Sequence, residues 1–199
     1  KAAQSCGAIP KVTVLPSQSI QAGDTIEEMR KIMSYATVII GATNYSFITT
    51  DAVGYALRRG ARFLSLPLSC NDGRSLLEQD FLRMNPASAA RLGRPMLRCL
   101  GGGDTVHITT KLGTDITFDI RGRKPGLFHG VTARPGVCAS ASFEVFIPPV
   151  ETATNGRVIL DGSMGYIGLV KQPLELGFAG GYLTYIANTP DGDRLRAYL

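Results

Sequence analysis

One acidic residue stands inside an apolar run and is the first candidate for chemistry. Glu144 lies within residues 143–147, which predict a strand because apolar side chains alternate between its two faces. A carboxylate in such a strand is costly to bury unless something pairs with it, and a divalent metal ion is one such partner. An acid on a half-exposed strand also commonly faces water, so a metal ligand and a solvated side chain both stay open at this point.

A polar segment follows this strand. Asn155-Gly156 has the backbone freedom that a tight turn needs. We therefore expect residues 143–149 and 157–163 to form two strands joined by a polar turn that contains Asn155-Gly156.

The histidines and the remaining acids form no recognisable catalytic motif. His107 alternates with apolar neighbours in a predicted strand and is expected to face solvent, whereas His129 lies in a Gly-rich loop and is the better candidate. Asp115 and Asp119 alternate onto the outward side of one predicted strand. The sequence has no His-Glu-x-x-His and no Gly-x-Ser-x-Gly, so neither a zinc-protease helix nor a nucleophile elbow is predicted.

Composition indicates a folded protein without a nucleic-acid partner. The 199 residues are 44% hydrophobic and 19% charged, which is enough apolar material for a core. The net charge is +5, but the basic clusters at residues 58–62 and 121–124 contain no interleaved aromatic side chains for base stacking. No apolar run approaches the roughly 20 residues of a membrane helix, and residues 1–7 lack the apolar region of a signal peptide. No association with a membrane is therefore expected.

The four cysteines, at positions 6, 70, 99 and 138, are widely spread and lack metal-binding spacing. We interpret them as reduced thiols of a cytoplasmic protein.

The first half of the chain alternates helix and strand signals. Short β-branched or apolar runs at residues 11–16, 37–41 and 62–67 predict buried strands, and the helical patterns between them predict a parallel sheet with right-handed crossovers. Residues 1–7 look like the end of a helix that leads into the first of these strands. Because another strand should precede that helix, we expect the first strand of the sheet to be missing.

The second half of the chain is rich in predicted strands. Gly101-Gly102-Gly103 marks a break, after which residues 105–110 and 115–120 predict a hairpin. Further strands are predicted at residues 142–147, 157–161, 173–178 and 182–187. The fold expected is α/β: a Rossmann-like parallel-sheet domain at residues 1–100, followed by a β-rich α+β domain at residues 101–199.

A family resemblance adds to these patterns. The sequence resembles the M29 or aminopeptidase T family of thermophilic metallo-aminopeptidases in several short motifs. These are residues 113–118 with Arg121 and Arg123, the segment around Glu144, Asn155-Gly156, and residues 161–163. The resemblance covers nearly the whole chain, although Ser142-Phe143 stands where that family has a small residue before the acid.

The resemblance implies a hydrolase that removes N-terminal residues from peptides with two divalent ions, Zn, Co or Mn. By motif position Glu144 would be one metal ligand, and Arg121 and Arg123 would contact the carboxylate of a peptide substrate or lie at the subunit interface of a homodimer. The family's other ligands lie beyond the C-terminal end of this sequence. We therefore expect a fragment of the enzyme that is inactive by itself, because such a metal site needs several ligands.

Two alternatives stay open. The dihydroxypyridine ring-opening dioxygenases are similar to these aminopeptidases and use one non-haem Fe(II); their pattern lacks the strand glutamate, which favours the peptidase for this chain. The second alternative is a non-enzymatic α/β binding domain with a β-rich partner domain. The partner expected for the chain is a peptide or a small-molecule substrate.

Overall fold

The computed structural model describes residues 1–15, 23–43, 46–67, 76–165 and 167–199. The helices are α1 (Ala2–Ser5), α2 (Gly23–Glu28), α3 (Arg30–Met33), α4 (Asp51–Arg58), α5 (Pro86–Gly101) and α6 (Pro190–Tyr198), with short 3-10 helices η1 (Leu76–Glu78) and η2 (Asp80–Arg83). The strands are β1 (Val38–Thr43), β2 (Arg62–Pro67), β3 (Thr105–Thr109), β4 (Asp115–Asp119), β5 (Gly126–Phe128), β6 (Cys138–Ser140), β7 (Glu144–Phe146), β8 (Thr154–Leu160), β9 (Ser163–Met164), β10 (Gly168–Leu169), β11 (Leu174–Ala179) and β12 (Tyr182–Ile186).

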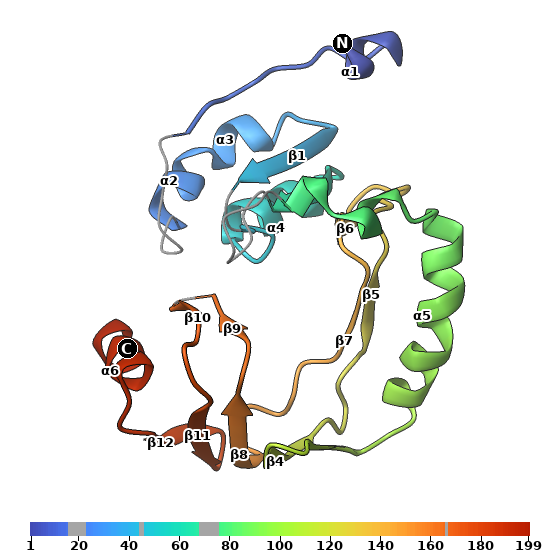
Figure 1. Cartoon of the computed structure of the whole chain (residues 1–199). Helices are drawn as coiled ribbons and strands as arrows, with labels where there is room; N and C mark the ends of the chain where they lie inside the picture. The colour runs from blue at the N-terminus through green and yellow to red at the C-terminus, as the bar shows by residue number, and fades with distance from the viewer. Residues whose placement is uncertain (16–22, 44–45, 68–75, 166) are drawn as a thin grey trace.

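Two larger sheets lie at opposite ends of the molecule, with α5 and the β5–β7 ribbon running between them (Figure 1). One sheet is parallel and carries the N-terminal helices. The other is antiparallel and carries α6. This mixed architecture confirms the predicted α/β fold with a parallel sheet and a β-rich second half.

The parallel sheet has the order β1-β2-β6 and packs against α4. Phe63 of β2 is fully buried, and its ring meets Phe47 edge-on with centroids 5.1 Å apart. Gly41 of β1 lies under this ring pair, since a Cβ there would stand 2.7 Å from the Phe47 ring. The third strand, β6, comes from residues 138–140, well past residue 101. The division of the chain into domains 1–100 and 101–199 stays a prediction.

The strand predicted at residues 11–16 does not form in the part that the structure describes. Residues 11–15 lie outside any sheet, and the side chains of Val12 and Val14 are 84% and 87% exposed. A β-branched run becomes a strand only where a neighbour satisfies its backbone N–H and C=O groups. Within the described residues β1 pairs with β2 alone, so its other edge carries no neighbour for such a run.

The antiparallel sheet has the order β12-β11-β8-β4-β3 and includes the predicted hairpin, in which Thr105 of β3 faces Asp119 of β4. Its apolar face packs on α6, where Leu195 is fully buried with Leu174.

The turn predicted at Asn155-Gly156 is wrong, because both residues lie inside β8. β7 pairs with β5, and β8 pairs with β4 and β11. Gly156, with φ +127°, is required there by close packing: a Cβ would lie 2.2 Å from the carbonyl oxygen of Asp115 in the neighbouring strand.

Two further observations concern the predicted surroundings of the protein. Cys6, Cys99 and Cys138 are free thiols, as expected, while Cys70 lies outside the described residues. Among the helices in the described ranges, none combines the length and apolar character needed to cross a bilayer.

Candidate functional site

A pocket of about 300 Å³ lies at the carboxyl ends of two parallel strands. Leu66, near the end of β2, and Ala141, just after β6, both line it. In α/β sheets ligands characteristically bind outside these strand ends. The lining residues are Leu66, Leu77, Phe81, Leu82, Met84, Pro86, Ala89, His129, Gly130, Ala141 and Phe143.

The β5–β7 ribbon brings two of these residues together. Phe128 of β5 faces Glu144 of β7, so His129 and Phe143 stand at the same end of the ribbon, one leaving it and the other entering it. Successive side chains in a strand point to opposite faces. Phe143 lines the pocket for this reason, and Glu144 does not.

The start of α5 forms another wall. Asn85 caps the helix, since its Oδ1 accepts the backbone N–H of Ala87 at 2.9 Å and that of Ser88 at 3.3 Å. Pro86 suits the first helical position because its missing N–H has no helical partner there. Pro86 and Ala89 both line the pocket.

Gly93 lets α5 approach the ribbon closely. A Cβ on Gly93 would lie 2.6 Å from Cδ1 of Leu127 and 3.3 Å from Cε2 of Phe143. Contacts below 3.0 Å force a neighbour to move. The small residue therefore helps to hold Phe143 at the pocket wall.

His129 carries the one polar side chain among the described residues that line the pocket. Its Nδ1 is buried and has no hydrogen-bond partner among the residues that the structure describes. A buried polar atom left unpaired costs about 1–3 kcal/mol, and this nitrogen is itself shielded from the space of the pocket. The loop is fixed at the next residue, where the N–H of Gly130 donates to the carbonyl of Ser140 over 3.1 Å.

The serine hydroxyls near the strand ends are paired with one another. The Oγ atoms of Ser46 and Ser65 lie 2.8 Å apart, and the hydroxyl of Ser142 donates to Oγ of Ser140 over 2.9 Å. In addition, the N–H of Ala141 donates to the carbonyl of Ser65 over 2.9 Å. The bond from Ala141 ties β2 to the residue after β6.

The residues predicted as site residues lie elsewhere. Glu144 is exposed on β7 and is absent from the pocket lining. Arg121 pairs with Asp119, and its hydrogen bonds hold the pKa of that carboxyl below its usual range; Arg123 pairs with Glu151. The metal role of Glu144 and the substrate roles of the two arginines stay predictions, and the structure does not bring the three residues to the pocket.

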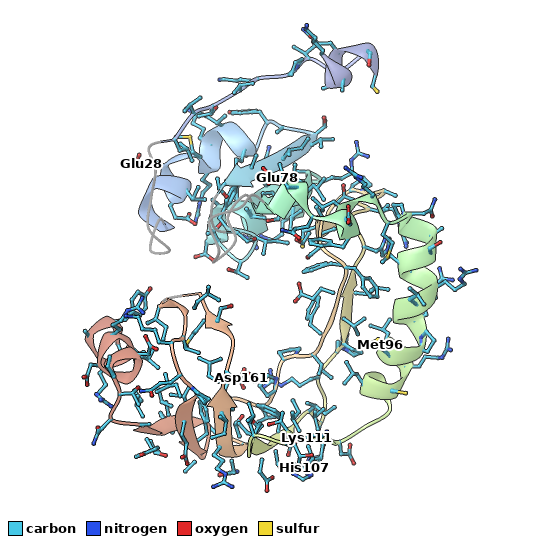
Figure 2. All side chains as sticks on the ribbon, in the orientation of Figure 1. Glu28, Glu78, Met96, His107, Lys111 and Asp161 are labelled. Carbon is cyan, nitrogen blue, oxygen red and sulfur yellow. The ribbon has the colours of Figure 1, made fainter. Side chains whose placement is uncertain are left out.

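His107 lies where the alternation of its strand predicts. It is exposed on β3, on the outer side of the antiparallel sheet (Figure 2), with Nε2 2.7 Å from Oδ1 of Asp115. Sequence reasoning named His129 as the better candidate of the two histidines but missed the apolar walls. Leu77 of η1, with Phe81 and Leu82 of η2, supplies part of these walls, and this apolar run is the signal that could have marked the pocket.

The described residues do not make a complete metal site. They contain no group of three or more His, Cys, Asp or Glu side chains close enough to hold an ion. A facial iron site of two histidines and one carboxylate is therefore not formed within the described part of the chain.

Comparisons with known proteins point to one family. The family model described as 2,5-dihydroxypyridine 5,6-dioxygenase (NicX) matches residues 4–199. The solved structure of 2,5-dihydroxypyridine dioxygenase from Pseudomonas putida KT2440 matches with a TM-score of 0.69 and 16% identity, covering 96% of this chain and 55% of that one. Wild-type AmpT from Thermus thermophilus matches with a TM-score of 0.54 and 13% identity, covering 88% of this chain and 54% of that one. The chain thus spans about half the length of these two structures. No curated protein matches the sequence.

These findings correct the predicted family and reaction. The match of the dioxygenase family model over nearly the whole chain overturns the prediction of an M29-type metallo-aminopeptidase, and with it the prediction of a hydrolase or protease. The short motifs that suggested the aminopeptidase do not separate it from the dioxygenase, and this chain shares its fold with solved structures of both kinds. The findings favour the dioxygenase, which the sequence left open as an alternative.

Proposed function

Since the chain belongs to the 2,5-dihydroxypyridine 5,6-dioxygenase family, we propose that it supplies the aromatic-binding part of a dioxygenase that opens a hydroxylated pyridine ring. The observation that carries the proposal is the family match over residues 4–199. The pocket at the carboxyl ends of β2 and β6 supports it. Its volume of about 300 Å³ stands at the lower end of the range for ligand pockets, which suits one small ring.

A dioxygenase of this kind is expected to use a metal such as Fe(II), which would supply the means to activate oxygen. The two ions of the aminopeptidase prediction have no support. The described residues form no group of three ligands, so they do not by themselves make a site for this metal. The contribution we assign to this chain is to bind the ring, to orient it and to exclude water from its faces.

The test is oxygen uptake by the chain supplied with Fe(II), with 2,5-dihydroxypyridine compared with unsubstituted pyridine. Uptake that requires both Fe(II) and the hydroxylated ring would support the proposal in full. Binding of the hydroxylated ring without uptake would support the binding role and agree with the expectation that this polypeptide is inactive by itself. A chain that binds neither iron nor the hydroxylated ring contradicts the proposal. The predicted homodimer, the cytoplasmic location and the absence of nucleic-acid binding stay predictions.

A further inference from the structure

The two basic clusters of the sequence have different surroundings in the structure. In the cluster at residues 121–124, Arg121 pairs with Asp119 and Arg123 pairs with Glu151. These carboxylates neutralise the charge of both arginines. Among the ion pairs that join described residues, none involves the arginines of the other cluster, which are Arg58, Arg59 and Arg62.

Three backbone segments meet at the amino ends of the parallel strands. The N–H of Arg62 donates to the carbonyl of Thr37 over 3.0 Å, and the N–H of Gly136 donates to the carbonyl of Ala61 over 2.9 Å. These bonds join the residues that precede β1, β2 and β6, which are residues 34–37, 58–61 and 134–137. The pocket lies at the opposite, carboxyl ends of the strands, so this edge of the sheet and the pocket are separate surfaces.

This edge of the sheet concentrates positive charge. Arg58, Arg59 and Arg134 are exposed, and Arg62 is half-buried. The end of α4 favours cations at Arg58 and Arg59 through the helix dipole, but the other two arginines lie outside that helix. The segments that carry the four arginines contain no Asp or Glu over residues 29–37, 55–62 and 131–137. We call this set of side chains the basic edge: Arg58, Arg59, Arg62 and Arg134.

We propose that the basic edge is a docking surface for a second protein that presents clustered Asp and Glu side chains. A guanidinium group suits a carboxylate because its N–H donors match both oxygens. Tyr35 and Val137, in the same segments, are 76% and 37% exposed and add apolar contact area. Arginine and tyrosine are the residues that protein interfaces favour. This proposal does not depend on the proposed function.

A single-stranded nucleic acid fits this surface less well than an acidic protein. Such a strand stacks successive bases on open aromatic faces. Of the two aromatic residues in these segments, Tyr55 already has the guanidinium groups of Arg30 and Arg59 at 5.7 Å and 5.9 Å from its ring centroid. Tyr35 is left as a single ring, which is too little for a stacking platform.

The test is the binding of labelled poly-L-glutamate, followed by fluorescence anisotropy at low and at physiological salt. We expect the native chain to bind, and to bind more weakly as salt screens the charges. The variant Arg58→Gln/Arg134→Gln changes exposed residues of two different segments. It should bind about 4- to 9-fold more weakly, since each exposed ion pair contributes a factor of about 2 to 3.

The variant Arg121→Gln/Arg123→Gln is the matched control, because it removes the same amount of charge from the cluster that is already paired. It should bind poly-L-glutamate as the native chain does. Thermal melts identify any variant that fails to fold. Amide spectra of the native chain give a second measurement without a substitution: the signals that poly-L-glutamate shifts should belong to residues 29–37, 55–62 and 131–137.

The proposal is overturned if the native chain does not bind poly-L-glutamate, or if the two double variants lose affinity equally. It is also overturned if the shifted amide signals lie outside the three segments. Oligothymidylate and vesicles that contain phosphatidylserine are the competing probes. Tighter binding of either one than of poly-L-glutamate would replace the acidic protein by a nucleic acid or a membrane surface.

Discussion

The contact between α5 and the β5–β7 ribbon gives the sharpest prediction about how this pocket is built. Replacing Gly93 by alanine puts a methyl group 2.6 Å from Cδ1 of Leu127 and 3.3 Å from Cε2 of Phe143. The substitution gains about 1 kcal/mol, because alanine is the better helix former. Overpacking costs about 1–3 kcal/mol. We expect the free energy of unfolding to fall by up to about 2 kcal/mol.

Shortening Leu127 removes the closest obstacle. Leu127→Ala alone should cost about 1–2 kcal/mol, less than the roughly 2–5 kcal/mol typical of fully buried leucine, because Leu127 is half-buried. In the double variant the methyl group that Gly93→Ala adds occupies space that Cδ1 of Leu127 has vacated. The effects of the two substitutions on the free energy of unfolding should therefore not add. The double variant should be about 1–2 kcal/mol more stable than the sum of the two single effects predicts.

Urea denaturation of the four proteins, followed by circular dichroism, measures this coupling. Ring binding gives an independent readout: Gly93→Ala should weaken binding of 2,5-dihydroxypyridine because Phe143 must move, and the double variant should recover part of the affinity. Additivity within about 0.5 kcal/mol would refute the argument, since residues without mutual contact behave in that way.

Two further predictions concern charged side chains. The backbone N–H of Lys171 donates to the buried Asp191 over 2.7 Å and holds the pKa of that carboxyl below its usual range. The stability that ionised Asp191 contributes is therefore fully present above its pKa in the unfolded chain, roughly 3.9. It is lost as the pH falls through the lower pKa of the folded chain. The melting temperature of Asp191→Asn should therefore depend less on pH below about 4 than that of the native chain. Calorimetry should show an affinity for 2,5-dihydroxypyridine within about twofold of the native value in each of three variants, Arg121→Ala, Arg123→Ala and Glu144→Gln, because none of these residues lines the pocket. A roughly tenfold loss of affinity in any of these variants would place the substituted residue at the ligand.

Much of the fold could be predicted because its signals are local. The alternation in residues 105–110 and 115–120 corresponds to the hairpin of β3 and β4, and the apolar run at 62–67 corresponds to the central strand of the parallel sheet. The hydrophobic periodicity of a strand and the residues that favour a turn are properties of a few neighbouring positions, so a single sequence is enough to identify them.

The failed predictions depended on partners. The run at residues 11–15 has the composition of a strand but no neighbouring strand in the described structure, and Gly156 serves close packing against Asp115 where a turn was expected. Neither sequence run carries information about which backbone lies beside it. Pairing is decided when distant segments meet, as β6 shows by joining β2 from far along the chain.

The same division applies to the pocket. The sequence by itself marked His129 as the better of the two histidines and showed apolar side chains before α5. Only the tertiary structure brings His129 and Phe143 into the lining of one pocket, buries Nδ1 without a partner among the described residues, and leaves Glu144 exposed. The physical reason is that burial and hydrogen-bond satisfaction depend on every element packed around an atom, whereas residue type and spacing describe one segment at a time.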